Sequence, residues 1–85
     1  MAYADMVRES RRLAILQVLN EDPLHGANQA VMQRALSALG LAASMDAVRA
    51  DLAWLAEQGL CTVQSGERFT VGVITQRGQD AATGV

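Results

Sequence analysis

The segment from residue 44 to residue 74 constrains the fold of this chain most, because an amphipathic helical pattern there gives way to a β pattern. Apolar residues repeat at i, i+4 and i+7, the spacing of one helix face, in Val48, Leu52 and Leu55. Ser44 is a favourable N-cap, Asp46 places a carboxylate in the first turn, and Gly59 suits the position after the last turn. These signals predict a helix over residues 44–58.

After Gly59 the apolar period changes from 3.6 to 2, which is the period of a β-strand. Residues 60–64 and 68–74 have strand character and flank a turn, and Phe69, Val71 and Val73 alternate onto one face. An isolated two-stranded ribbon is not stable in water, so this hairpin over residues 60–74 is expected to pack on the helices.

A further helix is predicted at each end of the chain. The first begins within residues 1–10, as an N-terminal extension, and continues through residues 13–19, which are almost uniformly apolar. A helix that is apolar on most sides is buried on more than one side. At the other end, Thr75 is expected to cap a short helix, with a tail, within residues 75–85.

Between these regions, a proline and a glycine bracket a loop over residues 20–26, and a second helix follows from about residue 27 to residue 39. Gly40 ends this helix, and Leu41 is expected to fold back onto its last turn. The link over residues 40–44 has the length that sets two helices at an angle.

Together these segments predict a mainly α fold with a small β-hairpin, in a single domain over residues 1–85. Its parts are three helices, a two-stranded wing and a short C-terminal helix. This order is the plan of a winged helix-turn-helix. A domain of this size buries only roughly 60–65% of its unfolded surface.

The glycine and apolar positions resemble those of winged-helix regulators of the ArsR and MarR type. The pattern consists of Val48, Leu52, Leu55, Gly59, Leu60, Ile74, Thr75 and Gly78. The resemblance implies that the helix over residues 44–58 enters the major groove of DNA and that the hairpin is the wing. The phrase from Asp51 to Leu60 is also similar to small winged-helix proteins of Mu-like prophages. The metal sensing of ArsR proteins is not implied, because the chain has no Cys-x-Cys motif and no pair of histidines.

Composition limits the class of protein. Apolar residues make up 51% of the chain, which suits a folded core, but no run is long enough to span a membrane. One cysteine and no signal-peptide pattern lead us to expect a cytoplasmic protein. The net charge is −2, and residues 44–85 hold three arginines against five acidic residues. Proteins that grip phosphates usually carry a basic stripe, so the charge weakens a DNA-binding interpretation without excluding it.

Few groups are suited to catalysis or metal binding. The chain has one Cys, one His and one Tyr, and its acidic residues are scattered along positions expected to face solvent. Cys61 is expected to be a small apolar residue at the start of a strand, and His25 a loop residue. Without a nucleophile and base, converging ligands or a glycine-rich loop, we expect no enzyme and no metal or cofactor site.

Candidate contacts to double-stranded DNA lie on the outer face of the helix over residues 44–58, because base edges are read from such a face. They are Ser44, Asp46, Arg49, Ala50 and Ala53. Further contacts are expected from the second helix and the hairpin tip, at Asn28, Gln29, Arg34 and Arg68. Four or five phosphate contacts predict a log–log salt slope of about −4.

Trp54, at the edge of the apolar stripe, has two interpretations. It packs against the hairpin or the first helix, or it is partly exposed at a protein interface, where Trp is enriched. The surplus apolar surface of the first helix favours a homodimer. The candidate interface residues are Val7, Leu13, Val18 and Trp54. The alternative to DNA binding is a winged-helix module that binds another protein, in phage assembly or on a host factor.

Overall fold

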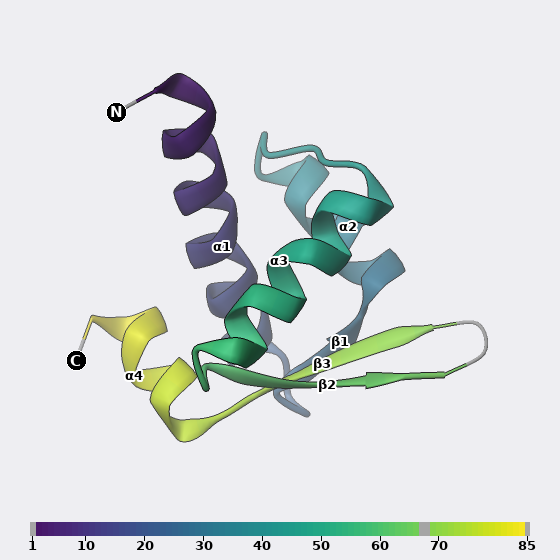
Figure 1. The fold of residues 1–85 in the computed structure, drawn as a ribbon. Coiled ribbons are helices and arrows are strands. Elements are labelled where there is room, and N and C mark those ends of the chain that lie inside the picture. Colours follow the sequence, from purple (N-terminus) through teal and green to yellow (C-terminus); the bar gives the residue numbers. More distant parts are fainter. Residues whose placement is uncertain (1, 67–68, 85) are drawn as a thin grey trace.

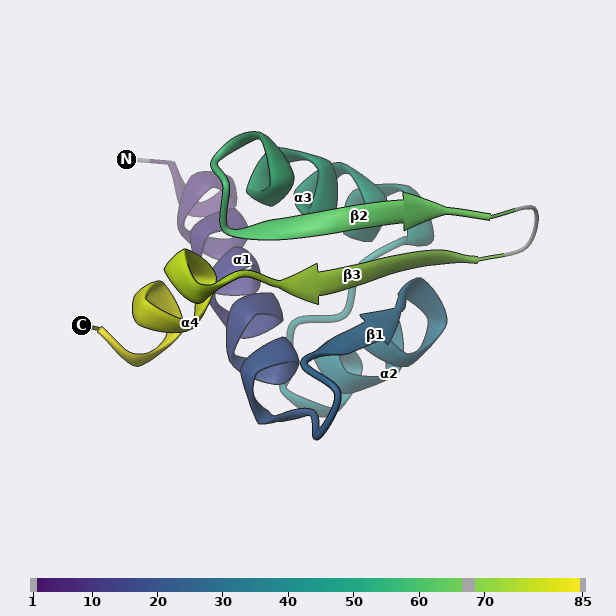
Figure 2. The same ribbon diagram turned by 90° about the horizontal axis from the view of Figure 1, so that it is seen from below.

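The computed structural model describes residues 2–66 and 69–84, and within them the chain forms four helices and three strands (Figure 1). In chain order these are α1 (Tyr3–Glu21), β1 (Gly26–Asn28), α2 (Gln29–Ala38), α3 (Met45–Glu57), β2 (Cys61–Ser65), β3 (Thr70–Ile74) and α4 (Gln76–Thr83). The strands form an antiparallel sheet in the order β1-β3-β2. Seen from below, α1, α2 and α3 lie behind this sheet, and α4 lies against α1 (Figure 2).

The boundaries of the helices follow from caps that the sequence contains. Three helices start after a residue whose side chain accepts a hydrogen bond from a backbone N–H three residues on: Asn28, Ser44 and Thr75. Two residues after the ends of α2 and α3 lie Gly40 and Gly59, which have left-handed φ angles of 77° and 75°. The next amide in each case, Leu41 or Leu60, donates back to a carbonyl of the last turn, as in a Schellman motif. The predicted ends of both helices are confirmed.

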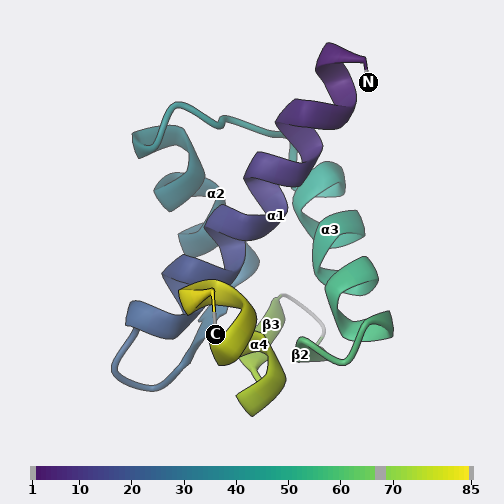
Figure 3. The same ribbon diagram turned by 90° about the vertical axis from the view of Figure 1, so that its left-hand side faces the viewer.

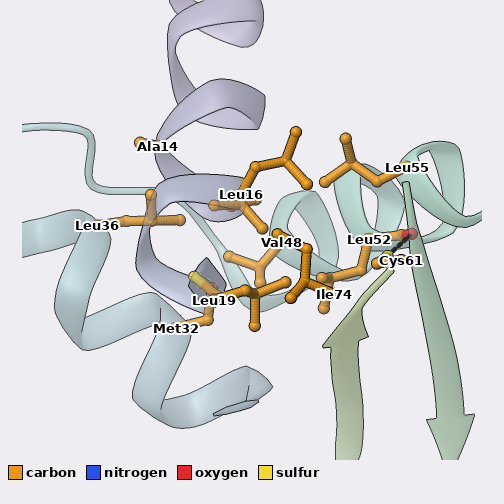
Figure 4. Packing of buried hydrophobic residues seen from close by; sticks show 11 residues of the cluster. Ala14, Leu16, Leu19, Met32, Leu36, Val48, Leu52, Leu55, Cys61 and Ile74 are labelled. Carbon is orange, nitrogen blue, oxygen red and sulfur yellow. Dashed lines mark hydrogen bonds between the residues drawn. The ribbon is translucent and has the colours of Figure 1, made fainter. Parts of the chain in front are cut away.

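The apolar core of the described residues lies between α1, α2, α3 and the sheet (Figure 4). Its large, fully buried members come from all three helices and are Ile15, Leu19, Met32, Leu36, Val48, Leu52 and Leu55. Cys61 and Ile74 complete it from the sheet. Burial of each large apolar side chain contributes about 1.5–3 kcal/mol, so the predicted stripe on α3 is a main source of stability.

Helix α1 is only partly supported by the rest of the molecule. Its buried residues begin at Ala14, and its first half extends beyond the other helices (Figure 1). Neither α1 nor any other helix of the described residues is long and apolar enough to cross a membrane.

The third strand, β1, corrects the expected two-stranded wing. Residues 26–28 were assigned to the end of a loop and the start of a helix, but they pair with β3, and α2 begins at Gln29. Gly26 allows this pairing, because a Cβ there would lie 3.0 Å from the carbonyl oxygen of Gly72. The sequence does not predict this strand, because Ala and Asn have low strand propensity and because three residues are too few to show an alternating pattern.

One face of β3 is turned away from the helices. It is the face onto which Phe69, Val71 and Val73 alternate. Phe69 and Val73 are exposed, whereas Gly72 and Ile74 face the core. A Cβ at Gly72 would lie 3.0 Å from a Leu52 methyl, so glycine at this position gives α3 room to pack closely on the strand. The hairpin does pack on the helices, but through the face that carries Cys61, Gly72 and Ile74.

Candidate functional site

The outer face of α3 is exposed along its length, and its charged residues are two acids, Asp46 and Glu57, and one base, Arg49. Asp46, Ala50 and Ala53 are exposed, as is Glu57 in the last turn. Arg49 forms an ion pair with Asp46 one turn earlier on the same helix. Exposed pairs of this kind are worth less than about 1 kcal/mol, so Arg49 remains available to another anion.

Ser44 lies at the start of this face, where its Oγ accepts a hydrogen bond from the backbone N–H of Ala47 at 3.1 Å. Replacing Ser44 with Ala should lower the free energy of unfolding by about 1 kcal/mol, because that amide loses its acceptor. Ser44→Asp should retain the stability, since a carboxylate also caps and suits the helix dipole. Urea denaturation followed by circular dichroism measures both effects. Equal losses in the two variants would contradict the capping role.

The candidate contacts on α2 are in different environments. The Oδ1 of Asn28 accepts a hydrogen bond from Val31 N at 2.9 Å and caps the helix. Gln29 is half-buried, and its Oε1 has no hydrogen-bond partner among the described residues. Arg34 is exposed and forms no ion pair with a described carboxylate. Arg68, the expected contact at the hairpin tip, lies outside the described residues.

A buried carboxylate between α1 and α3 is the main feature that sequence reasoning missed. Asp51 is 1% exposed, and both Arg11 and Arg12 bond to it through Nε, the latter at 3.1 Å. Asp51 was expected to face solvent with the other acids. The helical spacing does predict its burial, because Asp51 lies three residues after Val48 and therefore on the buried stripe of the helix.

This cluster also determines the position of Trp54. The guanidinium of Arg12 lies 4.1 Å from the centroid of the indole ring, a cation–π distance, and Trp54 remains 37% exposed. Trp54 therefore contacts the first helix, as one interpretation expects, and it is partly exposed; its role at a protein interface stays a prediction. One carboxylate between two guanidinium groups leaves the cluster with a net positive charge.

A groove of about 250 Å³ lies beside this cluster, between α1, α3 and α4. Figure 3 looks onto this face of the molecule. The groove is lined by Glu9, Arg12, Leu13, Leu16, Trp54, Leu55, Leu60 and Ala81. Of the candidate interface residues, Leu13 and Trp54 meet here. Val18 packs against the core instead, and Val7 is half-buried on the projecting part of α1.

The groups with potential for covalent or metal chemistry do not converge. Cys61 is buried at the start of β2, its Sγ lies 3.7 Å from the Leu52 carbonyl oxygen, and desolvation raises the pKa of the thiol. His25 is exposed in the loop before β1. Within residues 2–66 and 69–84, no three His, Cys, Asp or Glu side chains are grouped as metal ligands.

Similar proteins occur in a phage and in a bacterium. The uncharacterized protein gp26 of Escherichia phage Mu is 45% identical over 80 residues, which cover 94% of this chain and 82% of the phage protein. An uncharacterized protein of Haemophilus influenzae (strain ATCC 51907 / DSM 11121 / KW20 / Rd) is 36% identical over 78 residues, which cover 91% of this chain and 76% of that protein. No protein-family model matches the chain.

Proposed function

This chain belongs to the same family as gp26 of Escherichia phage Mu, and from that premise we propose that it is a small, phage-type DNA-binding protein with a winged-helix fold, acting as a transcriptional regulator. The observation that carries the proposal is the placement of α3. Its outer face is free, α2 precedes it across a short link, and the β2–β3 hairpin extends beyond the helices beside it (Figure 1). In helix-turn-helix proteins the second helix of such a pair lies in the major groove.

In this proposal the first two turns of α3 enter the groove. Arg49 exchanges its exposed partner Asp46 for a guanine edge or a phosphate, and Asp46 is then free to accept a hydrogen bond from cytosine. Ala50 and Ala53 are small enough to let the helix approach and to contact thymine methyl groups. Arg34 supplies a phosphate contact from α2, with Asn28 and Gln29 at the start of that helix. A second phosphate contact is proposed for Arg68, which lies outside the described residues.

The charges of the chain set the expected strength of binding. Four arginines already pair with carboxylates of the described residues: Arg8, Arg11, Arg12 and Arg49. The pairs of Arg11 and Arg12 are mostly buried and are not released to DNA. Affinity for arbitrary DNA should therefore be low, and sequence-specific contacts on α3 must supply most of the discrimination.

Selection from a randomised pool of DNA duplexes, sequenced at two salt concentrations, tests the proposal. We expect a short motif to be enriched, and the two cationic phosphate contacts, Arg34 and Arg68, predict a log–log salt slope of about −2 per bound chain. Arg34→Ala should weaken binding to all sequences and reduce the slope by about 1, whereas Arg49→Ala should relax selectivity at one base pair. Arg8→Ala, which alters a partly exposed pair on the projecting part of α1, is the matched control. Absence of an enriched motif, with weak binding that salt abolishes, would overturn the proposal.

The second candidate is a winged-helix module that binds a protein, and the acidity of α3 favours it. The outer face carries Asp46 and Glu57, and its one arginine is already paired. Such a face is better suited to a cationic protein surface than to phosphates. If no DNA motif is enriched, Glu57→Arg, which leaves the core intact, should abolish binding to that partner. If Glu57→Arg still binds the partner, the outer face of α3 is not the binding site.

A further inference from the structure

The outer side of α1 presents apolar side chains that nothing in the described chain covers. Met6 is 54% exposed and Leu13 is 45% exposed. They are seven positions apart, so they lie on the same side of the helix, next to Glu9. Tyr3, one turn before Met6, is also exposed. Leu13 and Glu9 also line the groove beside Trp54, so this surface continues into it.

The two charges in this groove do not neutralise each other. Glu9 forms no hydrogen bond or ion pair with any described residue. Arg12 uses its Nε for Asp51, and its Nη atoms donate no hydrogen bond to a described residue. The groove thus contains one carboxylate and one guanidinium on the same helix, three residues apart, both without a full set of partners.

We propose that a second copy of this chain binds to this face, with the two α1 helices antiparallel across a two-fold axis. In a two-fold interface, residue i of one copy contacts residue j of the other and j contacts i. A surface with one anionic and one cationic group is complementary to itself in this arrangement. Glu9 of each copy pairs with Arg12 of the other, and Leu13 of each copy packs in front of the other copy's Trp54.

Two features of the structure favour this occupant over an unrelated partner. Arg12 is held in place by Asp51 and by the indole of Trp54, so little side-chain freedom is lost when it binds a carboxylate. Helix α1, with 19 residues, is about 28 Å long and provides enough length for a standard interface. The inference does not depend on DNA binding. If both proposals hold, the dimer presents two α3 helices to two half-sites.

Sedimentation velocity without DNA, at chain concentrations from about 1 to 100 μM, tests the inference. The wild-type chain should be a dimer at the upper end of this range. Glu9→Arg places like charges opposite each other and should raise the dissociation constant at least about tenfold. Leu13→Asp, at an exposed position, should give a monomer with unchanged circular dichroism. Glu57→Arg, the same charge reversal on the outer face of α3, should leave the dimer intact.

A cysteine at an exposed position locates the interface independently. Ser10→Cys lies between Met6 and Leu13 on α1, and air oxidation should cross-link it to its counterpart, since the native Cys61 is buried. Ser37→Cys, exposed on α2, is the control and should remain uncross-linked. A wild-type monomer at every concentration would overturn the inference. A dimer that tolerates both Glu9→Arg and Leu13→Asp would overturn the assigned face.

Discussion

Replacing Asp51 with Ala should lower the free energy of unfolding by about 3–5 kcal/mol, because two mostly buried guanidinium groups lose their shared carboxylate. Most of this loss of stability arises because the two arginines remain without a carboxylate partner, rather than because the carboxylate's own contacts are lost. Arg11 and Arg12 would then lie close together with like charge, without the carboxylate that both contact in the wild-type chain. For a domain of this size such a loss is a large part of the total stability.

Urea denaturation of Asp51→Ala beside Asp46→Ala provides the comparison. Asp46 also pairs with an arginine on α3, but that pair is exposed, so its removal should cost less than about 0.5 kcal/mol. Asp51→Asn should be intermediate, because an amide oxygen still accepts one hydrogen bond but carries no charge. If Asp51→Ala is no less stable than Asp46→Ala, the carboxylate does not hold the two helices together.

Gly78→Ala should destabilise the chain by roughly 3 kcal/mol, although glycine-to-alanine changes inside helices are usually stabilising. A Cβ on Gly78 would lie 1.9 Å from the carbonyl oxygen of Leu60 and 2.7 Å from Cγ1 of Ile74. The first of these atoms belongs to the backbone and cannot rotate away. Helix α4 would therefore have to move off the start of the hairpin, which would also disturb the groove against α1.

Gly72→Ala is the matched control for this change. Its new Cβ would meet only the methyl end of Leu52, at 3.0 Å, and that side chain can adjust. The loss of stability should be clearly smaller than for Gly78→Ala in the same thermal or urea unfolding experiment. Equal stability of Gly78→Ala and the wild-type chain would show that α4 does not pack as closely as described.

The sequence was most informative where local chemistry determines structure. Ser44 and Gly59 define α3 through hydrogen bonds to the helix's own backbone, and Leu41 folds back onto α2 for the same reason. Each of these capping residues lies within four residues of the helix end that it determines. The boundaries of α3 and the end of α2 were therefore predictable without any knowledge of the tertiary structure.

The features that could not be predicted depend on residues far apart in the chain. Strand β1 can pair with β3 because Gly26, which has no Cβ, lies against the carbonyl oxygen of Gly72, 46 positions later in the chain. The inward face of β3 is chosen by the fit of Gly72 to Leu52, which apolar alternation cannot reveal. The partners of Asp51 lie about 40 positions earlier, so its charge was counted as surface charge.

The shared carboxylate also limits how relatives of this chain can diverge. Asp51 on α3 pairs with both Arg11 and Arg12 on α1. An apolar residue at position 51 is therefore compatible with the fold only after both arginines have been replaced. The reverse order is easier, since losing either Arg11 or Arg12 leaves Asp51 with one partner. In relatives of this chain, we therefore expect Arg11 or Arg12 to be substituted before Asp51 is. Asp51 thus restricts the order in which substitutions in this cluster are tolerated.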